Sequence, residues 1–307
     1  MEINGSSGEK KMKPPISVII LTYNEEKNIQ ACLESIHDFV EEIFIVDSSS
    51  TDKTLEIAKH YTKNIYQHPF ETQGKKFNWA LDNLPISTDW IMRLDADERV
   101  SGELREELYH RLSNLPPQIT GLYVKRKVYF MDRFIKHGGY YPIWLLRLWR
   151  KDKGRCEELQ LTDHIILSEG KTAHLKNDII DWNKKGLSFW VDKHNGFATR
   201  YANELISTQD GSIKELTSIN SSLFGSQEKR TRWLRQNFYI RLPLFARCLF
   251  YFIYRFFLRF GFLDGKEGLI FHFLQGFWYH FLADAKIYEY QKMIKEDKLK
   301  SELVLKI

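Results

Sequence analysis

Hydrophobic and polar positions follow a strand–helix rhythm in the N-terminal third of the chain. Apolar runs at residues 16–21, 43–46 and 90–92 are typical of strands that are covered on both faces. Between these runs, apolar residues recur at helical spacing over residues 29–36 and again over residues 77–84. This alternation predicts an α/β fold in which a mostly parallel sheet carries helices on both faces.

The rhythm changes after Leu115. Strands are expected over residues 121–131 and 144–149, and a helix is expected over residues 188–205. The last part of the chain is rich in aromatic and basic residues and is expected to form amphipathic helices. These changes divide the chain into a flexible leader (1–15), an α/β domain (16–225) with halves at 16–115 and 116–225, and a helical region (226–307).

The positive charge of the chain is concentrated in one segment. Between Lys229 and Leu263 there are eight Lys and Arg residues and no Asp or Glu, so this segment carries +8 and the rest of the chain carries −3. A charge confined in this way argues against a surface that generally binds nucleic acid. The sequence also contains no recognised nucleic-acid-binding motif, so no nucleic-acid partner is expected.

The segment Leu242–Phe260 is expected to lie on a membrane surface and not to cross it. Its eleven Leu, Ile and Phe residues contribute about −3 to −7 kcal/mol to insertion, whereas three central arginines cost about +8 to +10 kcal/mol. On a helix, Arg241, Arg247, Arg255 and Arg259 fall within a sector of roughly 120°, opposite a broad aromatic face. This pattern is typical of an interfacial helix on anionic lipid. The alternative is a helical hairpin that packs its aromatic residues on the rest of the protein.

Cysteine usage indicates a reducing compartment. Cys32, Cys156 and Cys248 are widely spaced and odd in number, and the N-terminus carries no secretory signal pattern. A cytoplasmic setting is therefore expected.

Polar residues follow three of the predicted strands at their carboxyl ends. Tyr23 and Asn24 follow the first, Asp47 follows the second, and Asp95 and Asp97 follow the last. Since ligands bind at the carboxyl ends of strands in such sheets, one crevice is expected to gather these side chains. Asn24 is also expected to cap the first helix.

The two carboxylates after the last of these strands suit a metal ion. Asp95 and Asp97 are two residues apart, and because side chains alternate along a strand we expect them to point the same way. Such a pair can hold magnesium or manganese beside a diphosphate. Taken alone, such a pair is a weak signal and is more often an Asp-rich turn at the end of a strand.

A nucleotide at this edge would need partners for its base and its phosphates. Asp47 can accept a hydrogen bond from a pyrimidine N–H. Gly74 is the only glycine between residues 16 and 101, so a glycine-rich phosphate loop is absent there. Phosphate charge would then be met by a metal and by Lys75 or Lys76. Lysine in a first helical turn opposes the helix dipole, and a bound phosphate relieves that conflict; a solvated first turn is the alternative.

Three blocks of the sequence resemble glycosyltransferase family 2 in order and spacing. They are residues 17–26 (SVIILTYNEE), 45–52 (IVDSSSTD) and 94–99 (LDADER). The resemblance implies a GT-A fold and transfer of a sugar from a nucleotide-sugar with inversion at the anomeric carbon. Later segments are similar to the bacterial lipopolysaccharide-core β-glucosyltransferase type of this family. These segments are residues 139–142, 145–150 and 261–265.

The resemblance also implies roles for individual residues. Asp47 would contact the uracil, Asp95 would lie near the ribose and the metal, and Asp97 would bind the metal. The metal would act as a Lewis acid on the diphosphate leaving group. The segment that would line the nucleoside consists of Thr22, Tyr23, Asn24 and Glu25.

The catalytic base is expected in a segment where this sequence departs from the family. The family commonly places an acidic residue and a histidine there as His-Glu or Glu-His, whereas this chain has Asp163 and His164. Asp163 is our hypothesis for the base, with His164 second; such a base typically contributes about 10²–10⁴ in rate. An acid–His pair also occurs by chance on surfaces. Arg147 is expected to meet phosphate or an anionic acceptor, with simple solvation as the alternative.

We therefore expect a metal-dependent inverting glycosyltransferase that uses a UDP-hexose, with UDP-glucose as the first donor to test. Its acceptor would be a lipopolysaccharide or lipid-linked glycan, and it would be a peripheral protein on the cytoplasmic face of a bacterial inner membrane. One alternative is a catalytically inactive sugar-nucleotide-binding or membrane-surface adaptor, which the unusual residues 162–164 keep open. A nucleotidyltransferase is a weaker alternative because residues 22–25 are not a glycine-rich loop.

Overall fold

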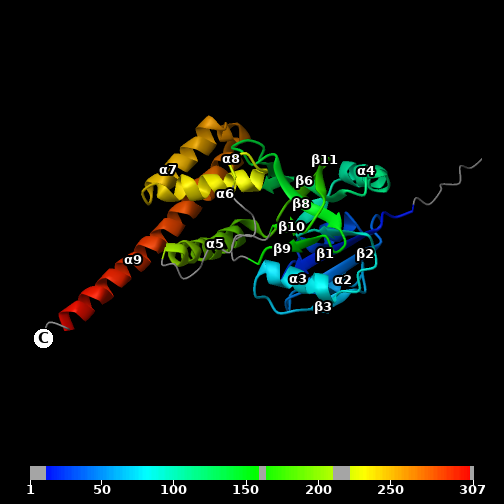
Figure 1. Ribbon diagram of the computed structural model, residues 1–307, viewed down its shortest axis with the longest axis horizontal. Coiled ribbons are helices and arrows are strands. Elements are labelled where there is room, and N and C mark those ends of the chain that lie inside the picture. The colour runs from blue at the N-terminus through cyan, green and yellow to red at the C-terminus, as the bar shows by residue number, and fades with distance from the viewer. Residues whose placement is uncertain (1–11, 159–163, 210–221, 305–307) are drawn as a thin grey trace, which may run out of the picture.

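The computed structural model describes residues 12–158, 164–209 and 222–304. Figure 1 shows an α/β body built on a twisted sheet and a group of helices at one side of it, from which the last helix extends away. The elements of the first part of the chain are β1 (Ile16–Thr22), α1 (Ile29–Glu34), β2 (Glu42–Asp47), α2 (Thr54–Ala58), β3 (Ile65–Gln67), α3 (Gln73–Asn83), β4 (Trp90–Arg93), β5 (Glu98–Val100), α4 (Gly102–Arg111) and the 3-10 turn η1 (Leu112–Asn114).

The second part of the body adds long strands, and helices follow them. The remaining elements are β6 (Ile119–Phe130), β7 (Arg133–Phe134), β8 (Ile143–Arg150), β9 (Gly154–Cys156), β10 (Ile165–Leu167), β11 (Lys171–Asp181), α5 (Gly186–Gln209), α6 (Gln227–Asn237), η2 (Tyr239–Arg241), α7 (Ala246–Ile253), η3 (Tyr254–Leu258), η4 (Gly261–Asp264), α8 (Gly265–Phe271), η5 (His272–Trp278) and α9 (Tyr279–Val304).

Within the described residues, the main sheet has the order β3–β2–β1–β4–β8–β6–β11–β5, with β7 paired on β6. Strands β3, β2, β1 and β4 are parallel. Strand β8 is antiparallel to both β4 and β6, and β11 is parallel to β6. The carboxyl ends of β1, β2, β4, β6 and β11 therefore all lie at one edge of the sheet.

Helices cover both faces of the sheet, as the apolar pattern predicts. Val18 and Ile20 of β1 pack with α1 and α4 on one face, whereas Ile19 packs with Phe77 of α3 on the other. The alternation of these neighbours follows from the period of two in a strand. The predicted α/β fold of GT-A type is confirmed, with a sheet that is parallel in its first half and mixed beyond it.

Helix α1 begins later than the sequence predicts. Its N-cap is Asn28, and Asn24 lies before it with a positive φ of 53°. The Asn24 side chain instead accepts a hydrogen bond from the backbone N–H of Thr51 at 2.8 Å. The prediction that Asn24 caps the helix is therefore wrong, because this side chain ties the loop after β1 to the loop after β2.

The C-terminal region is helical, and α5 packs along α9 through a small core that contains Tyr201, Ala202 and Ile287. A second core joins this region to the body, where Phe130 and Ile135 contact Phe271. None of the helices in the described part of the chain is long and apolar enough to cross a membrane.

Two of the four arginines in the stripe expected on this region do not face outward. Arg247 is 2% exposed and forms an ion pair with Asp284 of α9. Arg255 lies over the ring of Tyr140, 3.8 Å from its centroid, and donates to the hydroxyl of Tyr251 at 2.6 Å. The expectation that these two arginines meet lipid headgroups is wrong, because both are used to attach the helices to the protein.

Candidate active site

The carboxyl ends of β1 and β2 meet at a fixed carboxylate. Asp47 lies opposite Thr22 in the parallel register. Its Oδ1 accepts from the hydroxyls of Thr22 (2.8 Å) and Ser50 (2.5 Å), and its Oδ2 accepts from the Ser50 N–H (2.8 Å) and the Gln67 amide (3.2 Å). Burial acts to raise the pKa of Asp47, but these hydrogen bonds outweigh it and lower the pKa. Asp47 is completely buried, so a nucleotide base reaches it only if the side chains over it move.

The two lysines at the start of α3 behave differently. Lys76 is 2% exposed, and its Nζ donates to the carbonyl of Thr22 (3.2 Å) and the hydroxyl of Ser48 (2.6 Å). Burial lowers the pKa of Lys76 to about 8. Lys75 is exposed and pairs with Glu71 at 2.8 Å. The structure therefore brings Lys76 to the edge of the sheet and leaves Lys75 on the surface.

The turn after β1 is joined to a distant segment. Tyr23 is 58% exposed at the edge of the sheet. Glu25 accepts from Lys185 at 2.5 Å and from the side chain of Asn28 at 2.8 Å. Burial raises the pKa of Glu25, against the lowering effect of Lys185. The residues just before α5 therefore lie against the turn that follows β1, at the same edge of the sheet.

Asp95 lies in a turn after β4 and is held by arginines. Its Oδ2 accepts from Arg147 Nη2 at 3.0 Å, and its Oδ1 lies 3.4 Å from Arg93 Nε. Burial acts to raise the pKa of Asp95, but Arg147 and Arg93 outweigh it and hold the pKa well below its ordinary value. Arg147 also donates to Glu98 at 2.6 Å, and burial raises the pKa of Glu98 to about 8. Arg147 thus organises this acidic turn.

Asp97 lies two residues further along the same turn and faces the segment that enters α5. Its Oδ2 accepts from the side chain of Asn183 at 2.9 Å and lies 4.0 Å from Lys193 Nζ. Strand β4 ends at Arg93, so the strand alternation from which we expected the two aspartates to point the same way does not extend to them. Their directions are set by their separate partners.

Sequence reasoning missed several residues of this acidic edge. Asp181 ends β11, and burial and the nearby Asp97 raise its pKa to about 6. Burial acts against the charge of Lys193, but Asp97, Asp181 and Asp95 outweigh it and raise the pKa of Lys193. The same rule that selected Asp47 also applies to Asp181, because β11 ends at the same edge of the sheet.

The acidic edge suits a divalent ion only together with a ligand that brings oxygen atoms of its own. In the ranges that the structure describes, no three His, Cys, Asp or Glu side chains gather as a ligand set. Magnesium is commonly held by one or two carboxylates together with substrate phosphates. Asp95 and Asp97 can supply these two carboxylates. The donor set therefore fits an ion that arrives with a diphosphate.

The predicted base lies partly outside the described residues. Asp163 is not among them. His164 is half-buried directly before β10, and its carbonyl accepts from the Glu157 N–H at 2.8 Å. Glu157 is buried and forms an ion pair with Arg232 of α6 at 3.2 Å. A Cβ at Gly74 would lie 1.9 Å from the Glu157 carbonyl oxygen, so glycine lets this segment approach α3 closely. Glu157, the anchor of these contacts, is therefore held between α3 and α6.

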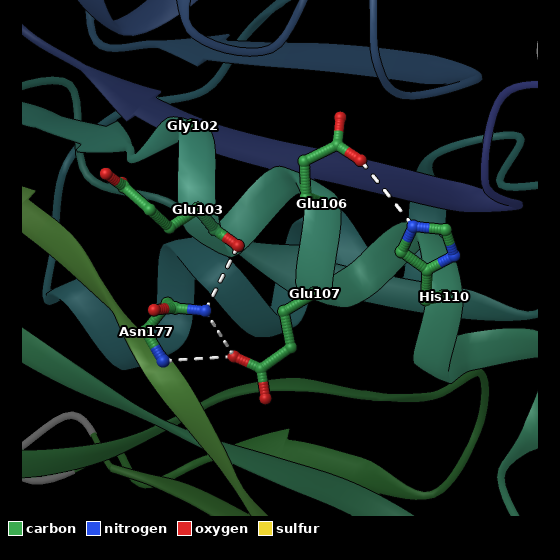
Figure 2. A pocket seen from close by; sticks show the side chains of 6 residues that line it. All are labelled: Gly102, Glu103, Glu106, Glu107, His110 and Asn177. Atoms are coloured by element: carbon green, nitrogen blue, oxygen red, sulfur yellow. Dashed lines mark hydrogen bonds and ion pairs between the residues drawn. The ribbon is translucent and has the colours of Figure 1, made fainter.

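A groove of about 590 Å³ lies beside α4, apart from the residues described above (Figure 2). Glu107 accepts there from the backbone N–H groups of Lys176 (2.8 Å) and Asn177 (3.0 Å), and from the Asn177 side chain at 3.0 Å. These bonds close the irregularity in β11 between His174 and Asp178. We therefore assign Glu107 a structural role.

A GT-A fold with acidic and basic side chains gathered at the carboxyl ends of its strands defines the class of protein. Residues 17–166 match the family model described as Glycosyl transferase family 2. The chain is therefore similar to glycosyltransferase family 2 over 150 of its 307 residues.

Two similar proteins are named as glycosyltransferases. An uncharacterized glycosyltransferase of Rickettsia typhi is 26% identical over 283 residues, which cover 89% of this chain and 87% of that protein. The lipopolysaccharide core biosynthesis glycosyltransferase LpsC of Rhizobium meliloti is 29% identical over 205 residues, which cover 63% of this chain and 73% of that protein. The solved mannosyltransferase PcManGT of Pyrobaculum calidifontis, in complex with GDP-Man and Mn²⁺, superposes with a TM-score of 0.49 at 13% identity, covering 91% of this chain and 88% of that one.

Proposed function

We propose that the protein is an inverting glycosyltransferase that transfers a hexose from a UDP-sugar, with UDP-glucose as the first candidate, to a lipopolysaccharide or lipid-linked glycan. The observation that carries this proposal is the single sheet edge that joins Asp47 and Lys76 to Asp95 and Asp97. The likeness to LpsC, whose name places it in lipopolysaccharide core biosynthesis, supports the acceptor class. We also propose that the protein works as a peripheral protein on the cytoplasmic face of the inner membrane.

Asp97, with Asp95, would hold the magnesium or manganese ion. When bound, this ion acts as a Lewis acid that stabilises the diphosphate leaving group. Arg147 and Arg93 keep Asp95 ionised, so this carboxylate is charged over the whole physiological pH range. Lys193, 4.0 Å from Asp97, is placed to neutralise negative charge at the same point.

Lys76 and the turn after β1 would bind the nucleoside diphosphate from the other side of the edge. The Lys76 ammonium lies between Thr22 and Ser48, where it places positive charge beneath the carboxyl ends of β1 and β2. The half-exposed Tyr23 and the neighbouring Asn24 and Glu25 would line the base and ribose. Asp163, or His164 in second place, would take the proton from the acceptor hydroxyl.

A thermal-shift panel of nucleotide-sugars, with and without manganese, tests the donor and the metal together. We expect stabilisation by UDP-sugars that grows when manganese is present. Asp97→Asn should remove the manganese-dependent part. Asp89→Asn, which changes an exposed aspartate at the opposite end of β4, should keep it. Indifference to every nucleotide-sugar would overturn the proposal.

Turnover tests the catalytic base and separates an enzyme from an inactive adaptor. Asp163→Asn should abolish transfer and leave UDP-sugar binding intact, whereas unchanged turnover would refute the assignment of Asp163. His164→Asn tests the second candidate in the same assay. If the unsubstituted protein bound UDP-sugar and transferred nothing to any lipopolysaccharide-derived acceptor, the adaptor alternative would be favoured.

A further inference from the structure

The helices between Leu249 and Phe273 expose an unusual amount of apolar surface. In this fully described segment, twelve large apolar side chains are at least 38% exposed. Single exposed apolar residues are common on soluble proteins, whereas many of them gathered in one segment are typical of a site of interaction. We call this surface the apolar face; its most exposed members are Leu258, Phe250, Phe260, Phe257 and Leu263.

Buried charges hold the apolar face outward. Arg247 pairs with Asp284, and Arg255 is enclosed by Tyr140 and Tyr251. Turning α7 so that its aromatic residues faced the protein would break these contacts and leave buried charge unpaired, which is strongly unfavourable. In Figure 1, α7 and α8 lie at the edge of the molecule, away from the strands of the parallel half-sheet.

The charges around the apolar face favour an acidic lipid surface over a second copy of the chain. Arg259 and Lys266 are exposed within the segment, whereas Glu267 is half-buried and Asp264 is buried against His137. A symmetric dimer would bring the same patch of each copy together and place these cations near their own equivalents. Headgroups of acidic phospholipids carry the complementary charge.

A cavity of about 610 Å³ lies where the apolar face meets the α/β body. It is lined by Arg133, Lys136 and His137 from the turn and strand after β6, and by Leu263 of the apolar face. Asp264 also lines it but accepts from the Lys136 N–H (3.3 Å), the His137 N–H (2.9 Å) and His137 Nδ1 (2.6 Å).

The remaining acidic side chains do not cancel the positive charge of this cavity. Asp132 lines it and is paired with Lys184 at 2.6 Å, which leaves Glu267 opposite the two exposed cations Arg133 and Lys136. A basic cavity beside exposed apolar side chains complements the two parts of a phospholipid. The cavity suits the anionic headgroup, and the apolar side chains suit the acyl chains.

We propose that the apolar face enters the acyl region of one bilayer leaflet and that the adjoining cavity binds the phosphate-bearing headgroup of a lipid in that leaflet. The proposal deepens the membrane contact of the proposed function and is independent of the transfer chemistry. It also differs from the interfacial helix predicted from the sequence, because apolar insertion replaces an arginine stripe as the main contact.

Flotation of the full-length protein with vesicles tests the insertion. We expect binding to phosphatidylcholine vesicles and stronger binding when phosphatidylglycerol is included. Phe257→Ser with Leu258→Ser should weaken binding to both vesicles by at least about tenfold, because large apolar side chains lose their transfer from water. The matched control is Phe70→Ser, because Phe70 and Phe257 are both 53% exposed.

The headgroup cavity is tested by a second pair of substitutions. Arg133→Ala with Lys136→Ala should reduce the preference for phosphatidylglycerol by roughly thirtyfold and leave binding to phosphatidylcholine unchanged, since two basic residues near the surface together contribute about 2 kcal/mol. Lys59→Ala with Lys63→Ala, which changes two exposed lysines near β3, is the control. A thermal shift by inorganic phosphate that the Arg133 and Lys136 substitutions abolish, together with an unchanged lipid preference, would identify a soluble-phosphate site and overturn the headgroup assignment.

Two further results would overturn the proposal. Binding to phosphatidylglycerol alone that salt abolishes and that Phe257→Ser with Leu258→Ser leaves intact would indicate electrostatic attachment. Absence of vesicle binding, together with a concentration-dependent dimer that these substitutions dissociate, would assign the face to a second copy. The thermal shift by UDP-sugar should be the same in all of these variants, so a failure of the docking proposal is distinguishable from a failure of the proposed function.

Discussion

Lys76 offers a sharp test of the nucleotide-binding edge because its ammonium is enclosed at the ends of β1 and β2. The side chain is 2% exposed, and burial lowers its pKa from 10.5 to about 8. Lys76→Met removes the titrating group and keeps an unbranched side chain of similar length. The comparison of the two proteins therefore isolates the titration of this one amine.

The sign and size of the effect follow from proton linkage. Above pH 8 the folded protein loses the Lys76 proton, whereas the unfolded chain keeps it up to pH 10.5, so the unfolded state binds more protons in this window. The free energy of unfolding contributed by Lys76 must then rise with pH, and below pH 8 it is constant. From about pH 7.5 to about pH 9.5 the rise is about 2 kcal/mol.

Urea unfolding of both proteins at these two pH values measures the effect. Lys76→Met also leaves the Thr22 carbonyl and the Ser48 hydroxyl without this donor, which adds a pH-independent cost of about 1–3 kcal/mol. The difference in unfolding free energy between the proteins should change by about 2 kcal/mol across the window. An equal pH dependence in both proteins would refute the reasoning.

The same titration should appear in donor binding. A diphosphate near the Lys76 ammonium favours its charged form, so the affinity for UDP should fall as the pH rises through about 8. Lys76→Met should bind UDP more weakly than the unsubstituted protein and without this pH dependence. Isothermal titration at matched pH values distinguishes this result from a general loss of folding.

Further predictions concern the acidic turn. Arg147→Ala leaves Asp95 and Glu98 without their common guanidinium and should lower the free energy of unfolding by about 3 kcal/mol in urea titrations; a loss below about 1 kcal/mol would contradict the role of this arginine. Lys193→Ala removes the cation 4.0 Å from Asp97 and should strengthen manganese binding without nucleotide by about tenfold in isothermal titration. Unchanged or weaker binding would show that Lys193 does not compete with the ion.

The strand rhythm was sufficient to predict the common edge of the site, because parallel strands end on the same side of a sheet. Thr22 and Asp47 are register partners for this reason. The sequence could not show that β11 returns parallel to β6, since its polar residues and its register shift hide the usual apolar run. Asp181 was therefore missed, although it ends a strand in the same way as Asp47.

The four arginines of the predicted stripe show where periodicity stops being informative. A helical pattern predicts the angles between Arg247, Arg255 and their neighbours, but it does not state which side meets the rest of the protein. That side is decided by Asp284 and Tyr140, which are far away in the sequence. A cationic stripe therefore predicts lipid contact only where no acidic or aromatic partner elsewhere in the chain covers it. Here such partners exist for Arg247 and Arg255, and covering these two arginines turns the aromatic residues toward the surroundings.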